Sequence, residues 1–276
     1  MDGEVASGIV VREWGDPGGP GILLWPGLGS TGAYFGGVAS QLPGRAVAAD
    51  PPGFGGSPPL DPCTYEGLVE VARATVDQRG CKAMVGHSLG AHVALGVGCD
   101  PPAELRAIVL IDGGFLTAQD FDQLGIPVLG GRSELVSWAR SNELRFPDWA
   151  AATRSVAEMV SAEVTPALEA YVREVMTEVD GEVREASSPE EAADLLLAVA
   201  GQDVLAFAQR LAVPTLLIAC GRSPSSRPVR EGAWRAFVTA SPMVELHVAE
   251  EWGHNPVLQA PDAFSRLVAD WLRAHI

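Results

Sequence analysis

Residues 81–98, CKAMVGHSLGAHVALGVG, decide the fold of this 276-residue chain. The run at the start of this stretch is short and apolar and predicts a buried strand, and the alanine- and glycine-rich part that follows predicts a helix. Between them GHSLG (residues 86–90) matches G-x-S-x-G, in which the serine occupies a sharp strand-to-helix turn between small neighbours. The pattern indicates that Ser88 is a nucleophile beside a helix N-terminus. The alternative is a glycine-rich turn whose serine only caps the helix.

Strands and helices alternate on both sides of this stretch. The strand-like runs span residues 8–14, 21–25, 45–49, 106–111, 214–219 and 243–248, and the helix-like segments span residues 32–42, 64–79, 228–239 and 262–275. Continuous apolar strands separated by helices are typical of a mostly parallel, doubly wound sheet that is covered on both faces.

The middle of the chain has a different pattern. Residues 113–205 show no convincing strand, and helical stretches predominate, at 132–142, 149–162, 165–178 and 189–199. We therefore divide the chain into a core, residues 1–112 and 206–276, and a helical lid, residues 113–205, inserted between two strands of one sheet. Such a lid would supply much of a substrate pocket. Four aromatic residues are candidates to line it, or else to pack the lid onto the core: Trp25, Trp138, Trp149 and Tyr171.

The composition excludes several classes of protein. The formal net charge is −16, which disfavours nucleic acid and anionic membrane surfaces as partners. No run of about 18 apolar residues is present to span a membrane. The four cysteines form no CxxC pair and have no zinc-like spacing, and no dinucleotide or phosphate-binding glycine motif occurs, so we expect no metal and no organic cofactor. The absence of a signal-like start predicts a cytoplasmic protein, and the alanine-, glycine- and arginine-rich composition suggests a bacterial source.

Two further motifs carry a resemblance to a known family. LWPGLGS (residues 24–30) is similar to the oxyanion loop of the α/β-hydrolase superfamily, and DPPGFGGS (residues 50–57) is similar to its D-x-x-G-x-G-x-S turn. The chain thus resembles this superfamily along nearly its whole length outside the lid. The resemblance implies an α/β fold, with a mostly parallel, doubly wound, eight-stranded sheet flanked by helices and an inserted helical lid. It also implies that the backbone N–H groups of Leu28 and Leu89 bind the oxyanion.

A serine hydroxyl needs a base, and His254 is the best candidate. It lies in the loop EWGHNP (residues 251–256), just after the strand at 243–248, and this loop resembles the family's G-H loop. The alternative is a surface loop histidine. The other histidines fit the role less well, since they lie beside the nucleophile, in a helix, in a strand or at the C-terminus: His87, His92, His247 and His275.

The third member of such a triad orients the imidazole, and here the sequence departs from the family pattern. The family usually places an acid after the strand at 214–219, but GRSPSSRP (residues 221–228) contains no carboxylate. Some branches of the superfamily place the acid at the end of the preceding strand, where this chain has Asp112. We expect Asp112 to be the acid. In the alternatives, Asp112 only caps a turn, Glu231 or Glu250 is the acid, or Ser88 and His254 form a dyad without an acid.

The loop without an acid contains arginines. Arg222, Arg227 and Arg230 could bind a substrate carboxylate or phosphate, but solvation or pairing with the acidic lid is the favoured interpretation.

These features predict a serine hydrolase that cleaves a carboxylic ester, lactone or thioester of a small to medium, partly apolar substrate through an acyl-enzyme. One alternative uses the same residues for acyl transfer, C–C cleavage or lyase chemistry. A second is a receptor of this fold that binds a small molecule with little turnover. Ser88 argues against epoxide hydrolases and haloalkane dehalogenases, which need a carboxylate nucleophile.

Overall fold

The computed structural model describes residues 8–222 and 225–276. Residues 1–7, which begin the segment without a signal-like pattern, and residues 223–224, from the loop without an acid, lie outside the described part. Within the described part a central sheet has the order β1-β3-β2-β4-β5-β9-β10. Its strands are β1 (Val11–Gly15), β2 (Gly21–Trp25), β3 (Arg45–Ala49), β4 (Cys81–His87), β5 (Ala107–Ile111), β9 (Thr215–Cys220) and β10 (Val244–Ala249).

The sheet is mostly parallel, as the sequence predicts. Only β1 runs antiparallel, at one edge, where it pairs with β3. The expected number of eight strands is wrong for the central sheet, in which the described residues form seven. The chain offers seven strand-like runs and each becomes a strand, so the eighth came from the resemblance and not from the residues.

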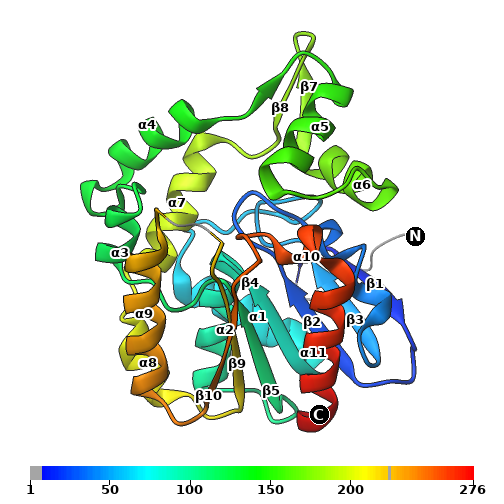
Figure 1. Ribbon diagram of the computed structural model, residues 1–276, viewed down its shortest axis with the longest axis vertical. Coiled ribbons are helices and arrows are strands. Elements are labelled where there is room, and N and C mark those ends of the chain that lie inside the picture. The colour runs from blue at the N-terminus through cyan, green and yellow to red at the C-terminus, as the bar shows by residue number, and fades with distance from the viewer. Residues whose placement is uncertain (1–7, 223–224) are drawn as a thin grey trace.

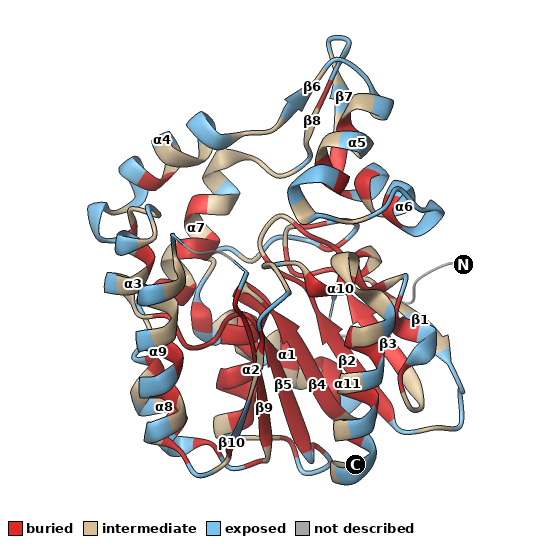
Figure 2. Cartoon of the chain, viewed as in Figure 1, coloured by how far each residue is buried: buried red, intermediate tan, exposed pale blue. Residues whose placement is uncertain are grey.

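Alternate residues along the inner strands face two separate cores, which is why strands such as β2 and β5 are apolar and buried throughout, whereas the edge strands β1 and β10 carry charged and exposed residues (Figure 2). In β2, Leu23 packs into one core and Ile22 and Leu24 into the other. The first core lies under α1 (Tyr65–Gln78), α2 (Leu89–Cys99), α8 (Val204–Arg210) and α9 (Arg227–Ala240). The second lies under η1 (Gly32–Phe35), η2 (Ala39–Gln41), α10 (Pro256–Gln259) and α11 (Pro261–His275).

The segment between β5 and β9 rises above the carboxyl ends of the strands (Figure 1). It contains α3 (Ala118–Gln123), η3 (Val128–Gly130), α4 (Arg132–Asn142), α5 (Trp149–Val160), α6 (Pro166–Val175) and α7 (Pro189–Ala200) before α8. Helices α5 and α6 share a small apolar cluster that includes Val156, Leu168 and Val172.

The prediction that residues 113–205 contain no strand is wrong. Three short strands form a second, antiparallel sheet of order β6-β8-β7: β6 (Arg145–Phe146), β7 (Met176–Val179) and β8 (Glu182–Glu185). The helix expected at 165–178 therefore ends at Val175. Asp180 and Gly181, both with positive φ, form the two-residue turn between β7 and β8, which is a common hairpin signal. The strands are short and largely charged, so no hydrophobic pattern marks them.

No helix in the described ranges has both the length and the apolar character that crossing a bilayer requires.

Candidate active site

Ser88 occupies a strained turn between β4 and α2. Its φ of 54° and ψ of −116° lie in a region that a non-glycine residue rarely adopts. A Cβ at Gly86 would lie 2.2 Å from the Gly90 carbonyl oxygen, and a Cβ at Gly90 would lie 2.4 Å from the Trp25 and Pro26 carbonyl oxygens. Gly86 therefore allows the two ends of the turn to approach each other, and Gly90 allows the turn to pack against the end of β2 and the loop after it.

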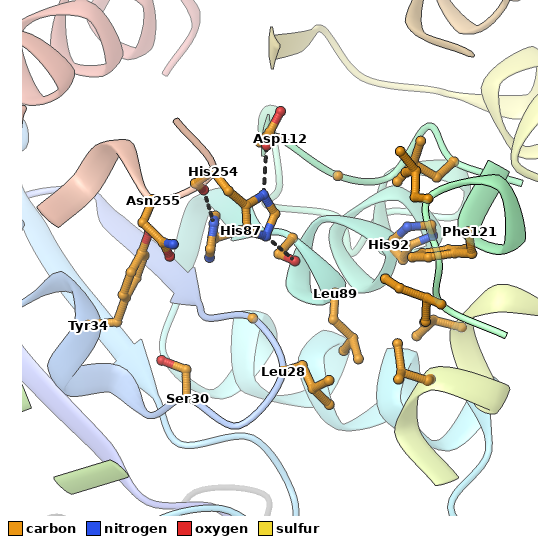
Figure 3. Close-up of a pocket in the computed structure, with 18 of the residues that line it drawn as sticks. Leu28, Ser30, Tyr34, His87, Leu89, His92, Asp112, Phe121, His254 and Asn255 are labelled. Atoms are coloured by element: carbon orange, nitrogen blue, oxygen red, sulfur yellow. Dashed lines mark hydrogen bonds and ion pairs between the residues drawn. The ribbon is translucent and has the colours of Figure 1, made fainter. Parts of the chain in front are cut away.

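His254 contacts both Ser88 and Asp112 at the carboxyl end of the sheet, and Figure 3 labels His254 and Asp112. The His254 Nε2 atom lies 3.0 Å from Ser88 Oγ, and Nδ1 lies 2.6 Å from Asp112 Oδ2. Asp112 follows β5 directly, and His254 lies in the loop between β10 and α10. These distances allow the carboxylate to orient the imidazole and the imidazole to accept the serine proton.

The carboxylate of Asp112 is buried and has several donors. Its Oδ1 atom accepts a hydrogen bond of 3.0 Å from the backbone N–H of Cys220, which is close because β5 and β9 are parallel neighbours. The same oxygen forms an ion pair with Arg230. Burial alone would raise the pKa of Asp112, but the hydrogen bond and charge of His254, with Arg230 and the Cys220 N–H, lower it below its ordinary value. Asp112 is therefore ionised at neutral pH.

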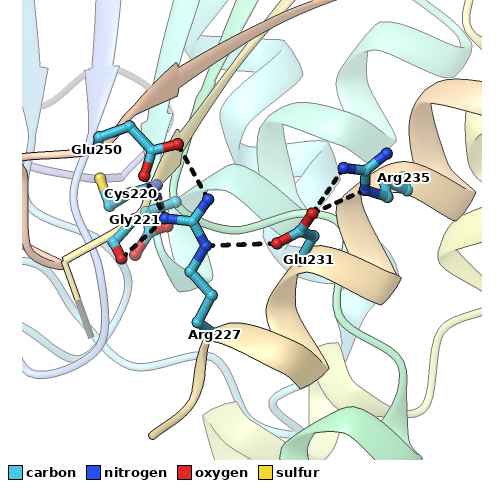
Figure 4. Close-up of polar contacts among 7 residues, drawn as sticks. Cys220, Gly221, Arg227, Glu231, Arg235 and Glu250 are labelled. Atoms are coloured by element: carbon cyan, nitrogen blue, oxygen red, sulfur yellow. Dashed lines mark hydrogen bonds and ion pairs between the residues drawn. The ribbon is translucent and has the colours of Figure 1, made fainter. Parts of the chain in front are cut away.

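The other candidate acids are engaged elsewhere (Figure 4). Glu250 and Glu231 both bind Arg227, with Nη2–Oε1 and Nε–Oε2 distances of 3.0 Å and 3.4 Å. Glu231 also accepts a bond of 3.0 Å from Arg235. The structure thus presents Asp112, and neither glutamate, to His254.

The predicted pairing with the acidic insertion does not occur for two of the three arginines. Arg227 and Arg230 pair with acids of the core, Glu250, Glu231 and Asp112, and not with the acidic insertion. The cause is that α9 begins at Arg227, so its first turn faces the ends of β5 and β9. The third, Arg222, is exposed.

His87 contacts the loop that carries His254 and so takes part in the site. Its Nε2 atom lies 2.7 Å from the backbone oxygen of His254, and its ring stacks on Tyr34 with centroids 4.7 Å apart. Because the carbonyl can only accept, Nε2 carries the proton. Burial, followed by the charge of His254, lowers the pKa of His87 to about 3, so the ring is neutral. His87 thus holds the loop that carries His254.

The predicted oxyanion donors lie next to the nucleophile. Leu89 is the first residue of α2, where backbone N–H groups lack partners within the helix, and Leu28 lies in the loop after β2. A Cβ at Gly27 would lie 3.0 Å from the Ser88 Cβ, so glycine allows this loop to approach the turn. The positions of Leu28 and Leu89 suit two amides that face a carbonyl bound at Ser88.

A cavity of about 430 Å³ opens above Ser88. Of the four aromatic candidates, Trp138 and Tyr171 line it. Trp25 does not, because it is fully buried in the core beneath the turn. Trp149 does not either, since its indole N–H donates to Glu178 at 3.0 Å on the insertion. In residues 8–222 and 225–276, no group of three or more side chains is arranged to hold a metal ion.

Comparison with known proteins identifies the family. The model of the alpha/beta hydrolase family matches residues 22–267, so the chain belongs to this family. The fold is shared with E-2-(acetamidomethylene)succinate hydrolase, which is 20% identical over 98% of this chain and 97% of that one, with a TM-score of 0.75. The thioesterase domain from the curacin biosynthetic pathway is 19% identical over 94% of each chain, with a TM-score of 0.73. An enol-lactonase from Burkholderia xenovorans is 17% identical over 96% of each chain, with a TM-score of 0.68. At these identities the likeness shows the fold alone.

Proposed function

We propose that the protein is a serine hydrolase that cleaves a carboxylic ester, lactone or thioester through an acyl-enzyme. The observation that carries this proposal is the continuous hydrogen-bonded chain from Ser88 Oγ through His254 to Asp112 Oδ2. Family membership indicates a hydrolase. The structural neighbours include a thioesterase domain and an enol-lactonase, which fit the same reaction class.

The geometry supports a two-step reaction. Ser88 Oγ attacks the substrate carbonyl while His254 Nε2 takes its proton, and Asp112 stabilises the resulting imidazolium. The Leu28 and Leu89 amides bind the tetrahedral oxyanion. His254 then transfers the proton to the leaving oxygen or sulfur as that bond breaks. Water attacks the acyl-enzyme, gives its proton to His254 and releases the acid, and the proton returns to Ser88.

We also propose that the insertion acts as a lid over this reaction. Leu116, Phe121, Trp138, Tyr171 and Leu196, all from residues 113–205, line the cavity with the nucleophile. A largely apolar cavity suits a small to medium substrate with an apolar portion.

The test is hydrolysis of short p-nitrophenyl esters with stopped-flow detection of p-nitrophenolate. We expect an initial burst equal to the enzyme concentration, followed by slower turnover, and loss of both in Ser88→Ala. Ser141→Ala is the matched control, because Ser141 is exposed on α4 and its hydroxyl bonds only its own helix, at the Ser137 carbonyl. Equal activity of Ser88→Ala and the control would reject the proposal.

Product analysis separates the alternative functions. Hydrolysis yields a free acid, whereas acyl transfer yields a new ester when an alcohol is added. Tight ligand binding without turnover would favour a receptor.

A further inference from the structure

His92 lies in the cavity with the nucleophile but has no part in the proposed reaction. It lies on α2, which begins at Leu89 directly after Ser88, and both Ser88 and His92 line this cavity. Its ring is buried beside Phe121, with ring centroids 5.7 Å apart, and both residues line the cavity. Figure 3 shows the pair on the opposite side of the site from Tyr34 and Asn255.

The imidazole of His92 has unused hydrogen-bonding capacity. Its Nδ1 atom is buried and has no hydrogen-bond partner among the described residues. The backbone oxygen of His92, in contrast, accepts a bond of 2.7 Å from the Tyr65 hydroxyl. A polar atom that is buried without a partner costs free energy, which a ligand atom can recover. Burial lowers the pKa of His92 to about 4, so the ring is neutral, with one donor and one acceptor.

The surroundings of His92 define the group that it can bind. Besides Phe121, the apolar residues that line the cavity include Leu116, Leu124, Ile126, Leu196 and Val199. A neutral imidazole within an apolar wall suits an uncharged carbonyl or hydroxyl oxygen. A carboxylate would instead require a buried charge.

The direction of proton transfer places the acyl chain on this side. His254 must protonate the leaving group, which therefore lies beside His254, Asn255 and Tyr34. The acyl chain then extends from the Leu89 amide toward His92. Resting on the proposed function, we propose that His92 is a specificity-determining residue that hydrogen-bonds an uncharged carbonyl or hydroxyl oxygen on an otherwise apolar acyl chain.

The test compares esters that differ only by one ketone. p-Nitrophenyl levulinate is paired with p-nitrophenyl pentanoate, and p-nitrophenyl acetylbutyrate with p-nitrophenyl hexanoate. The two ketones lie at successive carbons of the acyl chain, so the two pairs sample two distances from the reacting carbonyl. We expect wild type to prefer one ketone ester over its partner in kcat/KM by about tenfold, the effect of a net hydrogen bond of about 1.4 kcal/mol.

Two variants assign the preference to His92. His92→Leu is expected to lose the preference while keeping the burst with the plain esters, and His92→Gln, which still donates and accepts, is expected to keep part of it. The burst amplitude counts folded active sites in each variant. An unchanged ketone preference in His92→Leu, or no preference in wild type, would overturn the assignment to His92. Absence of any Ser88-dependent burst would instead reject the proposed function.

Discussion

Removing the charge of Asp112 should damage activity and stability for two separable reasons. Asp112 Oδ2 contacts His254, and Oδ1 pairs with Arg230. The Asp112 side chain is 1% exposed and that of Arg230 is 11% exposed. In Asp112→Asn the amide favours the wrong tautomer of His254, and Arg230 is left as a buried cation without its anion.

The loss of activity and the loss of stability differ in size, and a second substitution can restore only the stability. Loss of the orienting carboxylate should lower kcat by about 10,000-fold, as in other serine triads, or about 5 kcal/mol of barrier. Loss of one partner of a buried ion pair should lower the free energy of unfolding by about 3–5 kcal/mol. Arg230→Met should be destabilised similarly, because it leaves Asp112 with fewer donors. The double variant Asp112→Asn/Arg230→Met leaves no unpaired charge, so it should regain most of the stability but none of the kcat.

The assays are urea unfolding followed by tryptophan fluorescence and p-nitrophenyl ester turnover, on wild type, both single variants and the double variant. A double variant that is destabilised by the sum of the single effects would refute the pairing of Asp112 with Arg230. A kcat for Asp112→Asn within tenfold of wild type would refute Asp112 as the orienting acid.

Three further predictions follow from the glycines and histidines around the site. Gly90→Ala should abolish the burst and lower the melting temperature, because the added Cβ meets two backbone oxygens at 2.4 Å; an active, stable variant would contradict the packing described for the turn. His87→Phe should lower kcat about 5–10-fold with little change in KM, because it removes the donor to the His254 carbonyl. An unchanged kcat would show that the loop carrying His254 keeps its position without this hydrogen bond. Burial lowers the pKa values of His87 and His92 from 6.5 to about 3 and about 4, so below pH 6.5 the unfolded chain binds protons that the folded chain does not. Stability should therefore fall as pH drops from 6.5 to 4, by about 1.4 kcal/mol per pH unit for each imidazole, and urea unfolding of His92→Leu across this range should show a shallower slope. An identical slope would mean that His92 is protonated in the folded state.

The sequence was most informative where one physical requirement dominates. Strands buried on both faces must be apolar, so inner strands such as β2 and β5 could be identified without knowing their partners. The strand-to-helix turn at Ser88 needs small neighbours, so its glycines mark it. The adjacency of Asp112 and the end of β9 followed from the parallel order of neighbouring strands, since these strands bring their carboxyl ends to the same edge.

The sequence was least informative where the partner of a side chain decides its role. Nothing local to Arg230 shows that α9 would direct it at Asp112. Trp25 and Trp138 are both large aromatic residues near candidate loops, but only the packing shows that the first lies in the core and the second lines the cavity. The strands β6, β7 and β8 were missed because they are held by pairing with one another and carry little apolar pattern. The lack of a hydrogen-bond partner for His92 Nδ1 could not be inferred from its helix, because burial and the absence of a partner are properties of the assembled cavity.

The position of Asp112 matters for how relatives of this chain are sorted. In the proposed triad the acid stands at the end of β5, so the sequence of the loop after β9 does not need to supply a carboxylate. A search that scores activity by a carboxylate in that loop would discard this chain as inactive. The proposed nucleophile and acid belong to one strand–helix–strand unit, β4-α2-β5, and Ser88 and Asp112 are 24 residues apart in the sequence. Chains that appear to lack the acid should therefore be inspected one strand earlier before their function is dismissed.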